Sequence, residues 1–139
     1  RLDTIQAAVL NVKLTAFIEH ELDDVNRVCK LYNEKLRGIV ITPVIPDGYI
    51  SSFAQYTIRL KNKTERDLLQ AKLKEKGIPS MIYYIKPMHR QDAFIGLETT
   101  DSNFEVTNML CDTVLSLPMH PYMSEEDVDI VCESIKSSL

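Results

Sequence analysis

The sequence predicts a mixed α/β (α+β) fold, in which one long N-terminal helix leads into a small sheet flanked by helices. Three patterns support this fold class. Apolar residues recur every three or four positions over 2–36, they alternate with polar residues over 52–60, and helical spacing returns in later stretches. With 139 residues, 45% of them hydrophobic, the chain is long enough to bury a single core.

The first segment, 1–37, is predicted to be helical and to connect two domains. Gly38 supplies the stop, because glycine readily adopts the left-handed backbone that ends helices. Acidic residues crowd over 19–24, where Asp23 or Asp24 could cap a new helix, so we expect two helices or one kinked helix. Two apolar stripes on the first half indicate burial on more than one side, as expected if the helix also packs on a further domain.

The remaining residues, 38–139, are predicted to form one small α/β domain. β-branched residues over 39–45, interrupted by Pro43, indicate an edge strand or an extended arm. The alternation over 52–60 is typical of a strand with one buried face. One face would carry Ala54, Tyr56, Ile58 and Leu60, and the other Phe53, Gln55, Thr57 and Arg59.

A helix and a further strand are expected next. Thr64, three residues before Asp67, resembles the start of a capping box, and the helical spacing that follows ends at Lys76. Gly77 is expected to end this helix in a left-handed conformation. An apolar and aromatic stretch over 81–85 predicts a short strand, and a right-handed crossover through the helix would place it in one sheet with the strand before.

Two more helices are predicted toward the C-terminus. Ser102 with Glu105 and Ser124 with Asp127 have the spacing of capping boxes. Between these helices, 115–118 is expected to be a brief extended segment. The apolar residues of the last helix form one stripe and are expected to be buried: Val128, Val131, Cys132 and Ile135.

The composition excludes two classes of partner. Sixteen basic against 20 acidic residues give a net charge of −4, opposite in sign to the charge of a nucleic-acid-binding surface. No apolar run approaches the roughly 18 residues that a membrane-spanning helix requires. The charges over 61–76 alternate in sign, as they do on a solvated helix face.

The cysteines and histidines do not suggest a metal site. Each cysteine stands alone among apolar neighbours, which is typical of reduced core residues in a cytosolic protein. The histidines lie far from the cysteines and from one another in sequence, so no bound metal is expected. The residues concerned are Cys29, Cys111 and Cys132, and His20, His89 and His120.

The segment 83–91 is the richest candidate site. It places two phenols, an imidazole, two cations and an amide directly after a predicted strand, where a sheet can hold a functional loop in position. The residues alone leave open another interpretation, in which Tyr83 packs in the core and His89 is only a surface residue. His120 is interpreted as a loop or packing residue, and His20 as an exposed helix residue among acidic neighbours.

Five blocks stand out when they are taken in order: RLDTIQAAVLNVKL, the strand around Tyr56, TERDLLQAKLKEKGIPS, YYIKPMHRQDAF and LSLPMHPYMSEEDV. Together they resemble the carboxyl-terminal region of the DegT/DnrJ/StrS aminotransferases, also called pleiotropic regulatory proteins. The resemblance covers nearly the whole chain, and the order and spacing of the blocks are more specific than any single block.

The resemblance implies the small carboxyl-terminal domain of a fold type I aminotransferase, with a small, mainly antiparallel sheet. Such enzymes use pyridoxal phosphate to aminate a nucleotide-linked keto sugar. The family's Schiff-base lysine lies in an N-terminal cofactor-binding domain, which would precede Arg1 and be missing here. Lys13, Lys72 and Lys86 do not match the family's lysine motif. The resemblance therefore implies no catalytic residue in this chain, no cofactor bound to it, and no activity of the chain alone.

Three residues are implied to lie near cofactor or substrate. Arg1 matches the arginine that closes the family's GxNxR loop and would be close to the cofactor. Tyr84 and His89 match the family's YxxPxH block and could hydrogen-bond hydroxyl or phosphate oxygens of the sugar nucleotide. The chain departs from many relatives at Ile85 and Met88, which leaves the shape of this loop open.

The resemblance also implies glutamate as amino donor, a homodimer with shared active sites, and a cytoplasmic enzyme. Because the chain begins at Arg1 within a helical pattern, we expect it to be a piece of a longer protein. A function of another class stays open. A free-standing α/β module could bind a small ligand or act in regulation through its loop at 84–91 without doing any chemistry.

Overall fold

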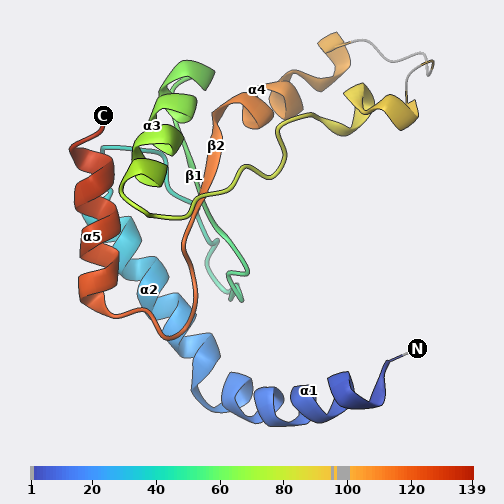
Figure 1. Ribbon diagram of the computed structural model, residues 1–139, viewed down its shortest axis with the longest axis vertical. Coiled ribbons are helices and arrows are strands. Elements are labelled where there is room, and N and C mark those ends of the chain that lie inside the picture. The colour runs from blue at the N-terminus through green and yellow to red at the C-terminus, as the bar shows by residue number, and fades with distance from the viewer. Residues whose placement is uncertain (1, 95, 97–100) are drawn as a thin grey trace.

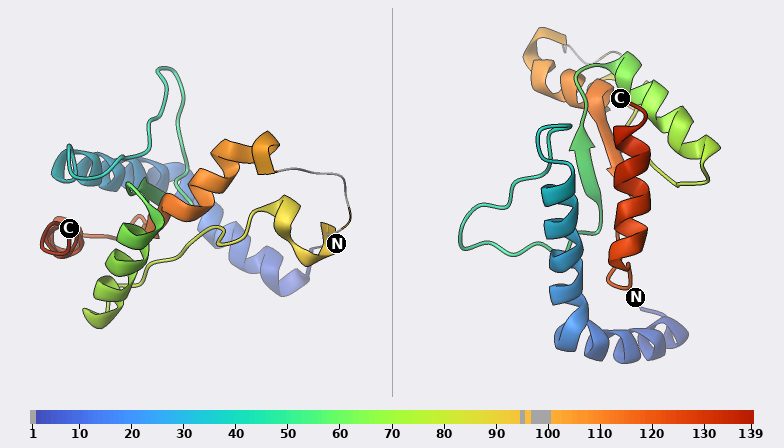
Figure 2. Two further views of the ribbon diagram at one scale, coloured as in Figure 1. Left: turned by 90° about the horizontal axis from the view of Figure 1, so that it is seen from above. Right: turned by 90° about the vertical axis from the view of Figure 1, so that its left-hand side faces the viewer.

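The computed structural model describes residues 2–94, 96 and 101–139, except the side chains of 101 and 102. A small antiparallel sheet lies at its centre, and helices surround the sheet (Figure 1). Two of these helices, α2 (Leu22–Lys35) and α5 (Glu125–Lys136), run side by side (Figure 2). The α/β fold with an antiparallel sheet is therefore confirmed.

The N-terminal helix consists of three parts. α1 (Thr4–Ala16) begins after Asp3, whose Oδ1 accepts a hydrogen bond from the backbone N–H of Ile5 at 2.8 Å. A π-helical turn, Phe17–Glu21, joins α1 to α2, and the chain changes direction there (Figure 1). A π-helical turn places an extra residue in the turn, which bends a helix while its backbone stays hydrogen-bonded.

The cause of this bend differs from the predicted one. Glu21, the residue before α2, has a helical backbone and provides no side-chain cap. The predicted capping by Asp23 or Asp24 is therefore wrong, and both residues lie in the first turn of α2, where the helix dipole favours negative charge. α1 buries none of its residues, whereas α2 buries one face against the core.

The sheet consists of β1 (Tyr56–Arg59) and β2 (Val114–Leu117). The strands pair antiparallel, with Tyr56 opposite Leu117. β2 includes most of the extended segment predicted over 115–118. Its role as the partner of β1 was not predicted, because 54 residues separate the end of one strand from the start of the other and pairing at that distance leaves no local signal.

Single bridges extend the sheet beyond both strands. Ile41 pairs with Arg59, and Met81 pairs with Ser116, in each case antiparallel. Met81 and β1 therefore lie on opposite sides of β2, so the helix between them links two segments of one sheet, as predicted. The strand predicted over 81–85 is wrong beyond its first residue, because the chain turns after Ile82. The segment before β1 is an extended arm.

β1 is shorter than the predicted strand over 52–60. Phe53 has a positive φ of 41°, which interrupts the extended backbone. Its side chain is buried, although the alternation placed it on the face opposite Tyr56. Ala54, predicted on the buried face, is exposed. Both errors have one cause, because alternating faces require a continuous extended backbone.

α3 (Lys63–Glu75) begins earlier than predicted. The cap is Asn62 rather than Thr64, and its side chain accepts a hydrogen bond from the backbone N–H of Glu65 at 2.9 Å. The end of the helix is as predicted. Gly77 has a φ of +73°, and the N–H of the next residue donates to the carbonyl of Leu73 at 2.9 Å, as in a Schellman motif.

The two remaining predictions of capping boxes have opposite outcomes. α4 (Glu105–Thr113) follows a 3₁₀ turn and has no side-chain cap at Phe104, so the box predicted at Ser102 is wrong. α5 begins with the predicted box, in which Ser124 Oγ accepts from the N–H of Asp127 at 3.1 Å. Three short 3₁₀ turns complete the described elements: Met88–Arg90, Asp92–Phe94 and Asp101–Phe104.

The core lies between the sheet, α2, α3 and α5. The rings of Tyr32 and Tyr56 stack within it, with centroids 4.7 Å apart. The predicted stripe of α5 is buried there, and Cys29, Cys111 and Cys132 are free and buried. Arg66 is also buried, although alternating charges predicted a solvated face for its helix. No helix in the described ranges is long and apolar enough to cross a membrane.

Candidate functional site

A cavity of about 660 Å³ opens between the segment 83–94 and α4. Two turns of 3₁₀ helix, Met88–Arg90 and Asp92–Phe94, give the segment its shape after it leaves the edge of the sheet. Both walls contribute lining residues, among them Tyr83, Tyr84, Lys86 and Met88 from the segment, and Leu110 and Cys111 from α4. Most of this lining is apolar, so the cavity suits a ligand with an apolar or planar part.

Several polar groups of this segment bind one another. Lys86 Nζ donates to Asp92 Oδ1 at 2.5 Å, and this contact lowers the pKa of the Asp92 carboxyl. Gln91 Nε2 donates to the backbone carbonyl of Lys86 at 2.8 Å. These bonds hold the segment in a compact loop. Tyr84 extends from that loop and is 72% exposed, so its phenol is accessible to a ligand.

The structure separates the two predicted substrate-binding residues. Tyr84 lines the cavity, whereas His89 does not. The imidazole of His89 stacks on the ring of Phe104, with centroids 4.3 Å apart and an interplanar angle of 14°. Tyr83 is 40% exposed and lines the cavity, so the interpretation that it packs in the core is wrong. Arg1 lies outside the described residues.

The α4 wall of the cavity was not identified from the sequence. Leu110 and Cys111 follow Gln91, the last residue of the candidate segment, by 19 and 20 positions. The sequence indicated a helix there but did not connect it with the candidate segment. A helix pattern shows which residues share a face, but it does not show whether that face meets the core or a cavity.

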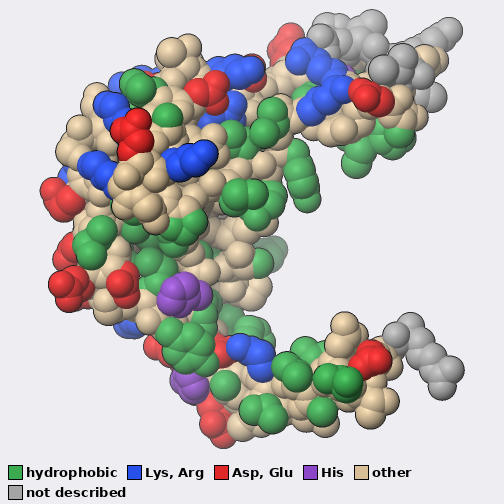
Figure 3. All heavy atoms as spheres, in the orientation of Figure 1, with side chains coloured by type: hydrophobic (Ala, Val, Ile, Leu, Met, Phe, Trp, Pro, Cys, Tyr) green, Lys and Arg blue, Asp and Glu red, His purple; other side chains and the backbone are tan. Residues whose placement is uncertain are grey.

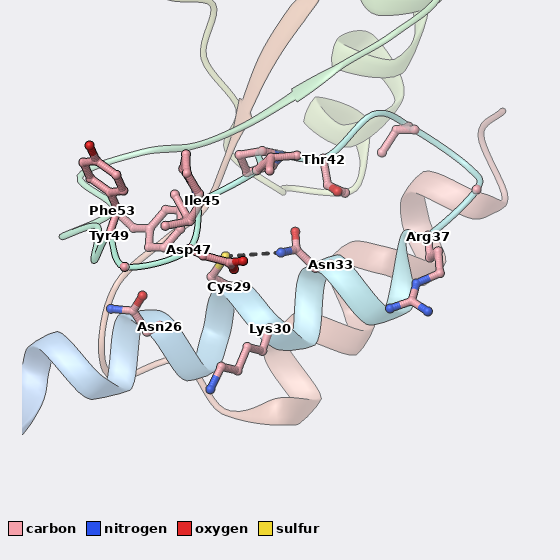
Figure 4. A pocket seen from close by; sticks show the side chains of 16 residues that line it. Asn26, Cys29, Lys30, Asn33, Arg37, Thr42, Ile45, Asp47, Tyr49 and Phe53 are labelled. Carbon is pink, nitrogen blue, oxygen red and sulfur yellow. Dashed lines mark hydrogen bonds between the residues drawn. The ribbon is translucent and has the colours of Figure 1, made fainter.

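A second cavity, of about 610 Å³, lies under the arm that precedes β1 (Figure 4). Asn33 points into it from α2, donates to Cys29 Sγ at 3.6 Å and accepts from the Tyr56 hydroxyl at 2.6 Å. Lys30 extends away from the arm in the same view. The amide of Asn33 is therefore already bound within the fold.

The described residues contain no group of three or more histidine, cysteine, aspartate or glutamate side chains that could hold a metal ion. His20 Nδ1 lies 3.0 Å from Asp24 Oδ2 on the exposed surface of the helix, as its sequence context predicted. Two of the lysines considered in the sequence analysis also contact other groups of the chain. Lys13 pairs with Glu21, and Lys72 donates to a carbonyl at the C-terminus.

Comparisons with a family model, with curated proteins and with solved structures all identify the same family of aminotransferases. The model of the DegT/DnrJ/EryC1/StrS aminotransferase family matches residues 1–136. UDP-2-acetamido-2-deoxy-3-oxo-D-glucuronate aminotransferase of Pseudomonas aeruginosa is 37% identical over 97% of this chain, and a pleiotropic regulatory protein of Geobacillus stearothermophilus is 38% identical over 97%. The crystal structure of a DegT DnrJ EryC1 StrS aminotransferase from Brucella abortus matches 99% of this chain with a TM-score of 0.89 and 45% identity. In each case the chain spans about 36% of the relative's length.

Proposed function

This chain belongs to the DegT/DnrJ/EryC1/StrS aminotransferase family, and we propose that it is the small carboxyl-terminal domain of a pyridoxal-phosphate-dependent aminotransferase that acts on a nucleotide-linked keto sugar. The observation that carries this proposal is the match of nearly the whole chain to about a third of a sugar-nucleotide aminotransferase. That relative's name specifies a 3-oxo sugar linked to UDP. We therefore propose a nucleotide-linked 3-oxo sugar as the substrate class.

We propose that the described residues do not form a cofactor site by themselves. A pyridoxal enzyme supplies a lysine for the carbonyl carbon, an acidic partner for the ring nitrogen and donors for the phosphate. Lys86 is the lysine that lines the larger cavity, and it is paired with Asp92. Gly38, Gly48, Gly77 and Gly96 are far apart in sequence, whereas a backbone phosphate cradle needs closely spaced glycines. The cofactor would be held by another part of the parent protein, near which Arg1 is proposed to lie.

The exposed apolar surface of the chain supports the proposal that the parent protein has a second domain. α1 is apolar on more than one side but buries no residue. Figure 3 shows hydrophobic side chains along α1 and on the lobe that carries the cavity, on both sides of a wide opening. Large contiguous apolar surface of this kind is typical of an interface. We propose that a cofactor-binding domain covers α1, so that 1–37 is the interdomain segment and 38–139 the small domain.

The chain's own part in the reaction would be to bind and orient the sugar nucleotide. The cavity offers apolar walls and the accessible phenol of Tyr84, which can donate to a hydroxyl or phosphate oxygen. His89 is proposed as a second contact from the same loop. The cofactor, when bound in the parent protein, would supply the chemistry of amino transfer. Glutamate as donor, a homodimer and a cytoplasmic location belong to the same proposal and rest on the family resemblance.

Amino transfer by the complete gene product tests this function. The protein would be supplied with pyridoxal phosphate, glutamate and a UDP-linked 3-oxo sugar, and formation of 2-oxoglutarate would be measured. We expect production that depends on the sugar nucleotide. A matched reaction with a 4-oxo sugar is the control. Turnover of the 4-oxo sugar alone would contradict the proposed position, and turnover of neither would contradict the proposed function.

Replacing His89 by alanine in the complete protein should raise KM for the sugar nucleotide by about tenfold, because one hydrogen bond to substrate would be lost. The visible absorbance of the bound cofactor should not change, since the residue is proposed to touch the substrate alone. His120→Ala, in the loop before α5, is the matched control and should leave both unchanged. Reduced cofactor loading in His89→Ala would show that the loop is wrongly placed.

A further inference from the structure

The direction of α1 is not fixed by core packing. None of its residues is buried, and the helix continues into the π-helical turn Phe17–Glu21 rather than docking on the sheet. Core packing normally fixes the angle of a helix because buried side chains interlock. Besides the hydrogen-bonded backbone of the turn, a side-chain contact near the bend can therefore help to hold α1 at the angle seen in Figure 1.

Glu21 makes such a contact at the bend itself. The residue is only 6% exposed, although every other residue of the π-helical turn is exposed. The Tyr122 hydroxyl donates to Glu21 Oε1 at 2.5 Å, across 101 positions of sequence. Lys13 Nζ, on the last turns of α1, lies 3.6 Å from the same oxygen. One carboxylate oxygen thus connects α1, the bend and a distant loop.

The loop that carries Tyr122 is anchored on both sides of it. The Tyr32 hydroxyl donates to the carbonyl of Pro118 at 3.0 Å, which ties the start of the loop to the buried face of α2. Arg27 Nη2 donates to the carbonyl of Met123 at 3.0 Å, which ties the end of the loop to α2. Tyr122 is therefore held relative to the core, and it offers Glu21 a fixed partner.

We propose that the Glu21–Tyr122 contact, supported by Lys13, sets the angle between α1 and the rest of this chain. Glu21 and Tyr122 are thus positioning residues that act through the geometry of the bend. The hydrogen bond from Tyr122 lowers the pKa of Glu21, so the carboxylate is charged at neutral pH and can attract Lys13 as well. The π-helical turn supplies the freedom to bend, and the side-chain contact selects one bend angle.

The consequence for activity rests on the proposed function. If α1 packs on a cofactor-binding domain, the bend angle decides how the cavity of the small domain is presented to the reacting atoms. The contact itself does not depend on that function. It is tested below on this chain alone, without cofactor or substrate, so failure of the contact and failure of the proposed function are distinguishable.

Double electron–electron resonance measures the distribution of distances between two nitroxide labels. With one label on α1 and one on the rest of the chain, the width of that distribution reports how well the angle of α1 is fixed. One label is attached at Ala8→Cys in α1 and the other at Lys74→Cys in α3, both of which are exposed positions. The native cysteines are buried, and labelling of the unsubstituted chain would confirm that they do not react. The parent pair should give one narrow distribution. Tyr122→Phe and Glu21→Gln should each make it about twofold wider, because α1 would sample several angles.

The controls remove the same kinds of group at exposed positions. Glu19→Gln removes an exposed carboxylate from the same π-helical turn, and Tyr49→Phe removes an exposed hydroxyl elsewhere. Both should leave the distribution narrow. The double variant of Glu21 and Tyr122 should be no wider than either single variant, because the two residues act through one contact. Distributions as narrow as the parent's in Tyr122→Phe, with circular dichroism showing an unchanged fold, would overturn the proposal.

Discussion

Replacing Arg66 by methionine is expected to lower the free energy of unfolding by about 1 to 3 kcal/mol, the cost of leaving a buried hydrogen-bond acceptor unpaired. Arg66 is 1% exposed. Its Nη1 donates to the carbonyl of Cys111 at 2.9 Å and lies 3.4 Å from the carbonyl of Val114. The Cys111 carbonyl belongs to the last turn of α4, which a helix leaves without an internal partner. Methionine fills part of the volume but leaves these buried carbonyls unpaired.

Urea unfolding followed by circular dichroism would measure this effect as a lower midpoint with an unchanged slope. Lys63→Met is the matched control, because it places the same side chain on an exposed position at the start of the same helix. That control is expected to change stability by less than about 0.5 kcal/mol. If Arg66→Met were as stable as the control, the guanidinium would not be the cap that joins α4 to β2.

Replacing Tyr56 by alanine is expected to cost about 4 kcal/mol, the loss typical of a large aromatic side chain in a core. The ring is fully buried, and it stacks on Tyr32. Its hydroxyl donates to Asn33 Oδ1 at 2.6 Å. Burial raises the pKa of Tyr56 far above its ordinary value, because a phenolate at this position would lack solvation. The residue therefore stabilises the fold as a neutral ring.

A graded series separates the ring of Tyr56 from its hydroxyl. Tyr56→Phe keeps the stack and should cost only about 1 kcal/mol, the value of one hydrogen bond. Tyr49→Ala is the control for loss of an exposed aromatic residue and should be nearly neutral. Thermal and urea unfolding would give the three values. Equal losses in Tyr56→Ala and Tyr56→Phe would show that the hydroxyl, and not the packing of the ring, carries the contribution.

Features encoded within a few residues could be predicted from the sequence. The box at Ser124 and Asp127 and the left-handed stop at Gly77 depend on neighbours in the chain, and both are present. The box expected at Ser102 with Glu105 has the same spacing but does not form, because a 3₁₀ turn precedes that helix. Spacing alone therefore indicates a cap without fixing the residue at which the helix begins.

Features that depend on distant partners could not be predicted. Arg66 and Glu21 lie in helices rich in charge, where solvated side chains are the usual case, yet each is buried by partners at least 45 positions away. The candidate site shows the same limit. Its loop could be located from the density of polar groups over 83–91, whereas the α4 wall and the separation of Tyr84 from His89 depend on tertiary structure.

The visible absorbance of the complete gene product, purified and saturated with pyridoxal phosphate, tests the assignment of this chain to a cofactor-dependent parent most directly. We expect a band from the lysine-bound cofactor, and we expect glutamate to bleach it as the amino group is transferred. A complete product that shows no such band at saturating cofactor would contradict the account, whatever ligand its small domain binds.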